Sequence, residues 1–439
     1  MIMIDVPVAG LVADVFLPER LPAPTVVVRT PYGTPGLWPE ADALTGAGLA
    51  VVLQDLRGRH RSPGEFEAGA DERADGHAAL DWITAQPWSD GVTCLYGTAY
   101  EAYAAWCAMG HPSVRGVAGR QSWPPAAVAV DEELWWRTEI GGGRQLRPGL
   151  YDLALTRPAW PVPLGAWPPT PSSWHPQARR AASRIRAADL PTLHLGSWYC
   201  GSAATTLRQA ALARRATVVM GGWASPLTHR LQPECAIDVP VDPGPSDLAL
   251  PWLVAVATGA DPVEGHRCLV LGSNRWEQTD PRPAARPDLW ALPLTGPASS
   301  SIDHDPADPY PSLPHSADLS VVGPRADVVR LSATGHVEWR GAARVRCRVG
   351  TDRGAELVAT LVHETPAGVR TRLADGTAPL TPGHTVAEMR CAPVAVDLPA
   401  GHTLHLELTV GRRPRHTAPE TPVTVTVSDV ELLVPGGRR

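Results

Sequence analysis

The sequence predicts a doubly wound α/β sheet followed by an all-β part. In the first 120 residues, short apolar runs alternate with helical patterns over short connections, which is typical of a sheet covered by helices on both faces. After about Ser300, alternating β-runs separated by Gly and Pro replace the helical periodicity, which favours an antiparallel sandwich or jelly roll. A chain of 439 residues with 44% hydrophobic residues has room for two or three such domains.

The first part contains four predicted strands and two predicted helices. The strands are apolar runs of the kind that is buried in a parallel sheet. The first helix has acidic residues in its first turn and buries Leu80 and Ile83. In chain order we expect strands at Ala13–Leu17, Thr25–Arg29 and Leu49–Asp55, a helix at Asp71–Gln86, a strand at Val92–Tyr96 and a helix at Tyr100–Met109.

The sequence changes character at about Trp123, where tryptophans fall among prolines and short helical pieces such as Ala178–Ala188. We interpret this segment as a cap inserted over the carboxyl edge of the sheet. Two further buried strands, Thr192–Gly196 and Thr217–Gly221, then resume the α/β pattern. The predicted domains are therefore a core in two pieces, 1–122 and 189–299, a helical cap at 123–188, and a β jelly roll of the galactose-binding type at 300–439.

Six β-runs are expected in the last part, and we find no internal repeat among them. Whether this part contributes to a homo-oligomer or only supports the core is left open. The runs are Val328–Leu331, Ala343–Val349, Leu357–His363, Val394–Leu398, Thr403–Val410 and Val423–Leu433.

The overall composition excludes several classes of partner. The formal net charge is −6 and no basic run is present, so neither nucleic acid nor an anionic membrane surface is an expected partner. No stretch is long and apolar enough to span a bilayer, and the N-terminus lacks the pattern of a secretory signal. The seven scattered cysteines contain no CxxC pair, which favours reduced thiols in a cytoplasmic protein.

Ala99 is the most informative residue of the chain. It lies in the segment Leu95-Tyr96-Gly97-Thr98-Ala99-Tyr100-Glu101-Ala102, where a β-run turns sharply into a helical run. This is the layout of a nucleophile elbow, in which a serine projects its oxygen above a parallel sheet. Here the turn is present and the serine is not, and a methyl group cannot attack a carbonyl.

Further characteristic segments accompany this elbow, and most of them lie at the ends of predicted strands. They are Arg29-Thr30-Pro31-Tyr32-Gly33, Gln54-Asp55-Leu56-Arg57-Gly58 with Ser62-Pro63-Gly64-Glu65-Phe66, Gly196-Ser197-Trp198-Tyr199-Cys200, Gly221-Gly222-Trp223-Ala224-Ser225 and Asp305-Pro306-Ala307-Asp308-Pro309. In order and spacing the chain resembles the cocaine esterase and X-prolyl dipeptidyl aminopeptidase (CocE/NonD-like) family of α/β-hydrolases. The resemblance covers the core, the cap and the jelly roll.

The resemblance implies that all three members of the catalytic triad are replaced. Ala99 stands at the serine position, Cys200 at the aspartate position and Ser225 at the histidine position. It also implies that an oxyanion hole is kept, with the hydroxyl of Tyr32 and the backbone N–H of Tyr100 as its donors. Loss of a triad nucleophile or base costs on the order of a million-fold in turnover, so ordinary hydrolysis is not expected.

Two oxyanion donors under an apolar cap can still polarise a carbonyl or stabilise an enolate. The leading hypothesis is therefore a cofactor-free, non-hydrolytic catalyst that cyclises or isomerises a carbonyl-bearing small molecule in specialised metabolism. The alternative is a non-catalytic pseudo-hydrolase that binds a ligand or acts as a scaffold. A third, weaker reading is a hydrolase or acyltransferase with relocated residues, in which Cys200 and His229 form the pair of nucleophile and base.

The remaining candidates have ordinary structural explanations beside their functional ones. Glu101 is expected near the positive end of its helix and is kept as a candidate general acid or base. Arg57 is expected in an internal ion pair with Asp55 or Glu65. No metal or cofactor is predicted. The candidate pocket residues, which equally suit core or cap packing, are Trp123, Trp135, Trp136, Trp198, Trp223 and His229.

Overall fold

The structure is a computed structural model of the chain. It describes residues 1–67, 69–122, 175–223, 242–262, 265–284, 286–311, 313, 317–412, 416 and 418–436. Most of the expected cap, including Trp123, Trp135 and Trp136, and the loop with Ser225 and His229 lie outside these ranges.

The N-terminal part is built on a mostly parallel sheet. Its strand order is β1-β2-β4-β3-β5-β6-β7-β8-β9, with β1 and β2 antiparallel to their neighbours and β3 to β9 parallel. The expected strands are confirmed, with bounds that differ by up to three residues at an end. The strands are β1 (Ile2–Val8), β2 (Leu11–Phe16), β3 (Ala23–Thr30), β4 (Ala50–Asp55), β5 (Ser89–Thr98), β6 (Val114–Arg120), β7 (Pro191–Ser197), β8 (Arg215–Gly221) and β9 (Arg267–Gly272), with β10 (Arg275–Glu277) paired to β9.

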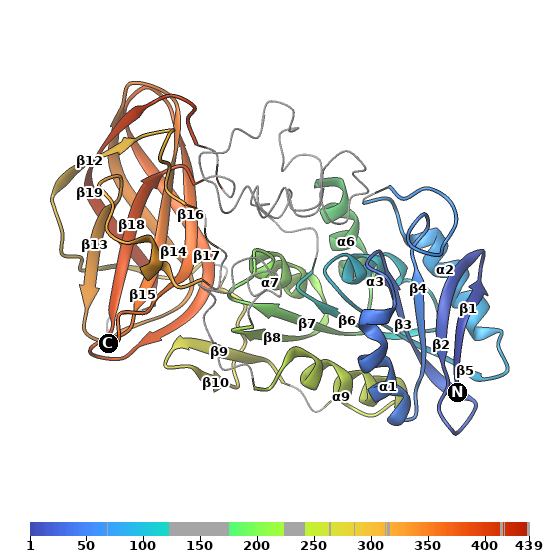
Figure 1. Cartoon of the computed structure of the whole chain (residues 1–439). Coiled ribbons are helices and arrows are strands. Elements are labelled where there is room, and N and C mark those ends of the chain that lie inside the picture. The colour runs from blue at the N-terminus through green and yellow to red at the C-terminus, as the bar shows by residue number, and fades with distance from the viewer. Residues whose placement is uncertain are drawn as a thin grey trace.

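Helices cover both faces of this sheet, as the doubly wound class requires (Figure 1). On one face α1 (Trp38–Gly46) packs against α9 (Pro245–Thr258), and the other face carries the remaining helices. Each layer packs on its own apolar cluster, with Ala41 and Trp252 in one and Leu80 and Trp106 in the other. The helices of the second face are α2 (Arg73–Thr84), α3 (Tyr100–Ala108), α6 (His175–Ala187) and α7 (Ala203–Leu212).

The helix α6 lies within the segment that is expected to form the cap. The sequence analysis placed Ala178–Ala188 in the cap, but α6 packs between α3 and α7 in the layer that covers the sheet. Its Ala181 and Ile185 are fully buried in the same cluster as α2 and α3. The helix has the amphipathic spacing of a surface helix, and the boundary between cap and core stays a prediction. Among the described residues no helix has the length and apolarity needed to cross a membrane.

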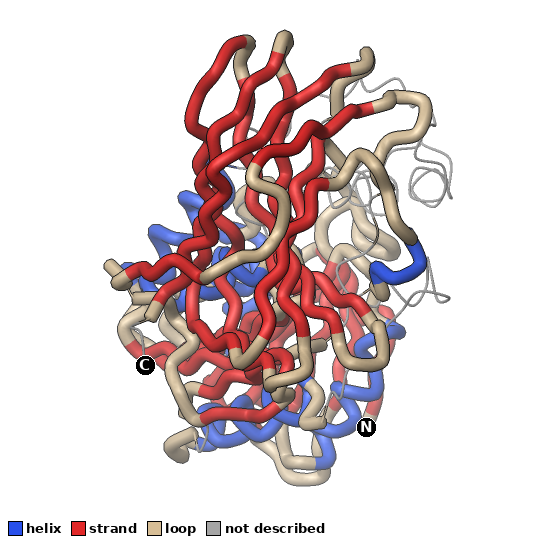
Figure 2. Tube along the Cα trace, turned by 90° about the vertical axis from the view of Figure 1, so that its left-hand side faces the viewer, coloured by secondary structure: helices blue, strands red, loops and turns tan. Residues whose placement is uncertain are grey.

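The C-terminal part is an antiparallel β structure whose long strands are seen face-on in Figure 2. Four strands form one sheet in the order β13-β18-β15-β16, and β17, β14, β19, β11 and β12 continue the large sheet. Strand pairing of this part begins at β11, before the expected boundary at 300. The strands are β11 (Leu289–Leu292), β12 (Ser299–His304), β13 (Val329–Thr334), β14 (Val337–Thr351), β15 (Ala355–Glu364), β16 (Arg370–Leu380), β17 (Gly383–Leu398), β18 (Thr403–Val410) and β19 (Val423–Pro435), with the 3₁₀ helix η6 (Leu319–Val322) between β12 and β13.

The two parts are joined through the edge of the parallel sheet. β17 pairs with β9 in parallel, with Val396 opposite Leu271 and Asp397 opposite Gly272. One apolar cluster contains residues of β8, β9 and α7 together with the inner faces of the C-terminal sheets. The β-rich part is therefore packed into the core, and both parts share one hydrophobic interior.

Candidate functional site: the elbow and the oxyanion pair

The turn between β5 and α3 has the geometry of a nucleophile elbow, as predicted. Ala99 adopts φ 53° and ψ −113°, a combination that L-residues avoid. The turn requires Gly97, because a Cβ there would lie 2.4 Å from Cβ of Glu101. The N–H of Ala99 donates to the carbonyl of Arg120 at 2.9 Å, and its carbonyl accepts from the N–H of Tyr103. The methyl group of Ala99 therefore occupies the apex of a fully formed elbow.

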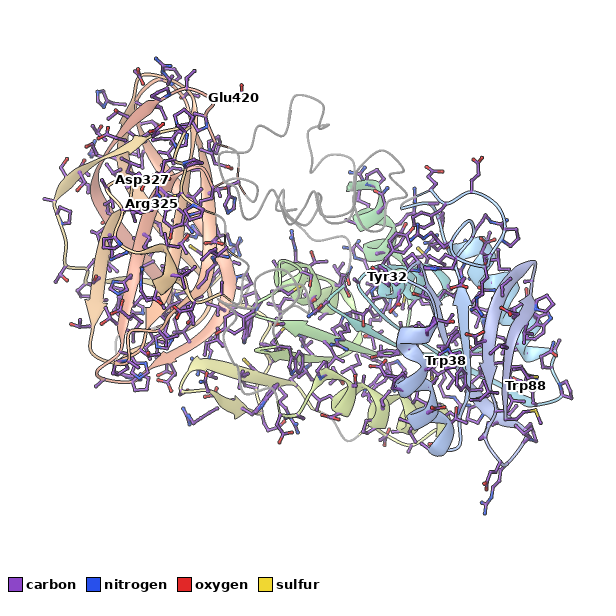
Figure 3. All side chains as sticks on the ribbon, viewed as in Figure 1. Tyr32, Trp38, Trp88, Arg325, Asp327 and Glu420 are labelled. Carbon is purple, nitrogen blue, oxygen red and sulfur yellow. The ribbon has the colours of Figure 1, made fainter. Side chains whose placement is uncertain are left out.

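The two expected oxyanion donors converge beside this apex. The backbone N–H of Tyr100 donates to the hydroxyl oxygen of Tyr32 at 3.2 Å. Tyr32 lies on the loop after β3, at the edge of the sheet where α3 begins (Figure 3). Burial raises the pKa of Tyr32, so its hydroxyl stays protonated and can donate. The carbonyl oxygen of a ligand could take the place of the Tyr32 oxygen as acceptor of the Tyr100 N–H. It would then lie between two donors, this N–H and the hydroxyl of Tyr32.

Glu101 lies beneath the turn and supports it. Its side chain is 3% exposed, and its Oε1 accepts from the hydroxyl of Thr30 at 2.7 Å while Oε2 accepts from the N–H of Thr98 at 2.9 Å. The hydroxyl of Thr30 in turn accepts from the N–H of Tyr32 at 3.0 Å. Desolvation raises the pKa of Glu101 to about 7, against the two hydrogen bonds that lower it. This placement suits a positioning residue and leaves no exposed oxygen for proton exchange with a substrate.

The Tyr100 side chain points away from the apex and fixes the start of α3. Its hydroxyl donates to Oε1 of Glu72 at 3.1 Å and accepts from the N–H of Gly69 at 2.9 Å. Glu72 also forms a buried ion pair with Arg29 at 3.2 Å. Only the backbone of Tyr100 is therefore available for the site, and its phenol holds the loop 69–72 against α3.

Of the three positions implied for the triad, the structure describes two. Ala99 is at the elbow, and Cys200 follows β7, where its Sγ lies 3.1 Å from Oγ of Ser202. Ser225 and His229 fall outside the described residues, so the pairing of Cys200 with His229 stays a prediction. A different histidine on β7, His194, is fully buried, stacks on Trp106 at 5.0 Å, and has its pKa lowered to about 3 by desolvation.

The two expected pocket tryptophans that the structure describes are packed into the interior. Trp198 is 6% exposed and its indole N–H donates to the carbonyl of Leu269 at 2.7 Å. Trp223 is 3% exposed and its N–H donates to the carbonyl of Pro243 at 3.1 Å. Their placement matches the packing explanation, and a pocket role for them stays a prediction. Among the described residues no three His, Cys, Asp or Glu gather in a group that could hold a metal ion.

Arg59, in the loop after β4, is a residue near Tyr32 that was not among the sequence-predicted candidates. Its side chain donates from Nε to the carbonyl of Pro31 at 2.9 Å and lies over the ring of Phe66, 5.2 Å from its centroid. Phe66 contacts the Tyr100 ring edge to face at 5.8 Å. Arg57 does form an ion pair, but with Asp75 at 2.6 Å, not with the expected Asp55 or Glu65. The alternation Arg57-Gly58-Arg59-His60-Arg61 was the available signal, since it carries three cations in five residues.

Comparison with known proteins agrees with this geometry. Residues 9–131 match the model of the X-Pro dipeptidyl-peptidase (S15 family). The chain is 27% identical to the cocaine esterase of Rhodococcus sp. (strain MB1 Bresler), with 83% of this chain and 80% of the esterase aligned.

Solved structures share the whole fold. An aminopeptidase from the marine sediment archaeon Thaumarchaeota archaeon superposes with a TM-score of 0.77 at 16% identity, covering 99% of this chain and 95% of that one. An α-amino acid ester hydrolase gives a TM-score of 0.76 at 16% identity, covering 99% and 96%. A CocE/NonD family hydrolase from Staphylococcus aureus gives 0.66 at 14% identity, covering 97% and 91%. These similarities establish an α/β-hydrolase core with a C-terminal β-rich domain.

Proposed function

We propose that this chain has a catalytic role other than hydrolysis. It carries an X-Pro dipeptidyl-peptidase (S15 family) domain and is a homologue of cocaine esterase. The observation that carries the proposal is the methyl group of Ala99 at the apex of an intact elbow, beside the converging donors of Tyr32 and Tyr100. The substrate is a carbonyl-bearing small molecule. The reaction is a cyclisation or an isomerisation that needs stabilisation of oxygen charge and no nucleophile.

The two donors account for the rate enhancement that such a reaction needs. One preorganised oxyanion donor is worth roughly 2.7–4 kcal/mol, and a site with no triad still retains about 10³–10⁴-fold catalysis over water from binding and the hole. As the carbonyl becomes an enolate, its oxygen gains charge and both hydrogen bonds strengthen. Because Tyr32 is held by the Thr30 and Glu101 contacts, this stabilisation needs little rearrangement of the protein.

Strain at Ala99 is an independent support for a retained role of the turn. A non-glycine residue at φ 53° costs on the order of 1–3 kcal/mol. The turn gives no nucleophile in return, since Ala99 has none. It does direct the Tyr100 N–H toward the Tyr32 hydroxyl, so the oxyanion pair is the feature that depends on the strained conformation.

The test is the substitution Tyr32→Phe, with Tyr96→Phe as a matched control. Tyr96 lies on the neighbouring strand β5, and its hydroxyl bonds to Glu40 instead. On a substrate identified by metabolite screening, we expect Tyr32→Phe to lower kcat by about 10²–10³-fold, with a smaller rise in KM. Tyr96→Phe should leave kcat within about threefold of wild type, because its hydroxyl bonds to Glu40 and to Arg120, and neither is a donor of the oxyanion pair.

Undiminished turnover by Tyr32→Phe would remove the oxyanion role. Saturable binding of the same small molecules with no turnover by wild type would instead support the non-catalytic pseudo-hydrolase, our second candidate. The third candidate, hydrolysis through Cys200, would require esterase activity that disappears in Cys200→Ser.

A further inference from the structure

Three arginines follow one another at alternate positions in the loop after β4, and two of them are neutralised. Arg57 pairs with Asp75 at 2.6 Å. Arg61 pairs with Asp55 at 2.8 Å, with Asp14 at 2.7 Å and with Asp5 at 3.0 Å. Between them, Arg59 has no carboxylate within 4.0 Å among the described residues, and its one hydrogen bond there goes from Nε to the carbonyl of Pro31. Of the three charges, that of Arg59 is therefore the one without an ion pair among the described residues.

This charge is partly removed from water. Arg59 is half-buried, its guanidinium lies over the Phe66 ring, and desolvation lowers its pKa below the ordinary value for arginine. A charge that is half-buried without a counter-ion is unfavourable until an anion reaches it. Because Nε is already engaged, the two terminal amino groups are the donors that remain, and they match the two oxygens of a carboxylate.

The position of this cation links it to the oxyanion pair. Arg59 holds the carbonyl of Pro31, the residue that directly precedes Tyr32. Its charge also acts on the Tyr32 phenol, in the sense opposite to burial. A ligand whose carbonyl oxygen lies at Tyr32 and Tyr100 would thus have its neighbouring groups within reach of Arg59.

The loop that presents Arg59 is built to hold one shape. The N–H of Arg59 donates to the carbonyl of Leu56 and the N–H of Ser62 to the carbonyl of Arg59, each at 2.9 Å. Gly58 has φ +68°, and a Cβ there would lie 2.3 Å from the backbone nitrogen of Phe66, so the two sides of the loop are in close contact. A cation held in this way loses little freedom when it binds an anion.

We propose that Arg59 binds a carboxylate of the substrate, which makes the substrate an oxo acid, a compound with a carboxylate near the reacting carbonyl. The proposal rests on the proposed function, since it names the substrate class of the same site. Arg59 anchors the acid end, and the donors of Tyr32 and Tyr100 receive the carbonyl oxygen.

The test compares an oxo acid with its neutral ester. The full chain is titrated with 4-oxo-4-phenylbutanoate and with its methyl ester by isothermal titration calorimetry. A hydrogen bond to a charged group contributes roughly 1.5–3 kcal/mol and 1.4 kcal/mol is tenfold, so we expect the acid to bind at least about tenfold more tightly. Arg59→Met should abolish this preference and leave the ester affinity unchanged. Arg59→Lys, which keeps the charge and loses the fork, should retain part of the preference.

Arg57→Gln is the matched control. It removes a charge two residues away that is already paired with Asp75, and it should preserve the preference for the acid. The inference is overturned if the acid binds no more tightly than the ester, if neither binds, or if Arg59→Met keeps the preference. Tyr32→Phe separates this failure from that of the proposed function, because it should weaken acid and ester alike. If it weakens neither, the oxyanion role fails whatever Arg59 does.

Discussion

Glu101 joins the two pieces of backbone that carry the oxyanion pair. One carboxylate oxygen accepts from Thr98 at the end of β5, and the other accepts from Thr30 at the end of β3. The hydroxyl of Thr30 in turn accepts a hydrogen bond from the N–H of Tyr32. A carboxylate buried at this point supports the turn from below, and a role of Glu101 as general acid or base stays a prediction. The raised pKa follows from burial, and it makes the protein's stability depend on pH.

The sign of this dependence follows from proton binding. The folded protein holds the Glu101 proton up to a pKa of about 7, whereas the unfolded chain releases it near the ordinary value of 4.5. Between these values the folded state binds more protons, so the free energy of unfolding falls as the pH rises, by up to about 1.4 kcal/mol per unit. Glu101→Gln should remove this contribution. Between pH 5 and pH 7, urea unfolding should show a larger loss of stability for wild type than for Glu101→Gln.

The exposed Glu65 provides the control for this measurement. Glu65→Gln should reproduce the wild-type change between the two pH values. Equal pH dependence of wild type and Glu101→Gln would show that the Glu101 carboxyl is ionised throughout this range.

The strand–turn–helix element of β5 and α3 keeps its strained conformation without the residue that normally explains it. Ala99→Gly should relieve the cost of φ 53°, on the order of 1–3 kcal/mol, at an entropic cost of roughly 0.5–1 kcal/mol. We therefore expect a gain of about 1 kcal/mol in the free energy of unfolding by urea denaturation. Ala104→Gly, in the middle of the buried helix α3, should lower it by about the same amount or more. A destabilised Ala99→Gly would mean that the methyl group makes packing contacts that outweigh the strain.

Some elements could be predicted from sequence and others could not, for physical reasons. The strands β3, β4 and β5 are apolar runs, and their positions were predicted closely. The strand β6 was missed because Gly116 and Gly119 interrupt its apolar pattern, although these glycines make room for Trp252 and Trp106. The helix α9 contains Pro251, which sequence rules treat as a break.

The strand β16 was hidden by charge. Arg370 and Arg372 lie within it and read as a solvated segment, yet both are buried and paired across the sheet with Glu407 and within the strand with Asp375. A sequence pattern does not reveal such ion pairs, because the partner is far away along the chain or lies on a strand whose register is not known beforehand. The site shows the same limit: the elbow and Tyr32 could be found from local motifs. That Arg59 has no ion pair among the described residues depends on which carboxylates Arg57 and Arg61 contact elsewhere in the chain.

In the molecule as a whole, the α/β core and the β-rich domain are packed into one unit. β17 extends the parallel sheet at β9, and Trp198, in the loop implied for the triad acid, is buried in the apolar cluster that both parts share. A hydrogen bond between the side chains of Tyr199 and Thr371 joins the same loop to β16. The β-rich domain therefore contacts the loop after β7 directly.

The central claim is that the chain works without a covalent intermediate at the elbow, and intact-protein mass spectrometry tests it most directly. The full chain is incubated with a fluorophosphonate and, separately, with 4-nitrophenyl acetate, reagents that acylate or phosphonylate an activated nucleophile. We predict an unchanged mass and no enzyme-dependent release of 4-nitrophenol. One adduct per chain on a serine or cysteine next to Ala99, formed together with turnover of the ester, would contradict the account and identify a hydrolase.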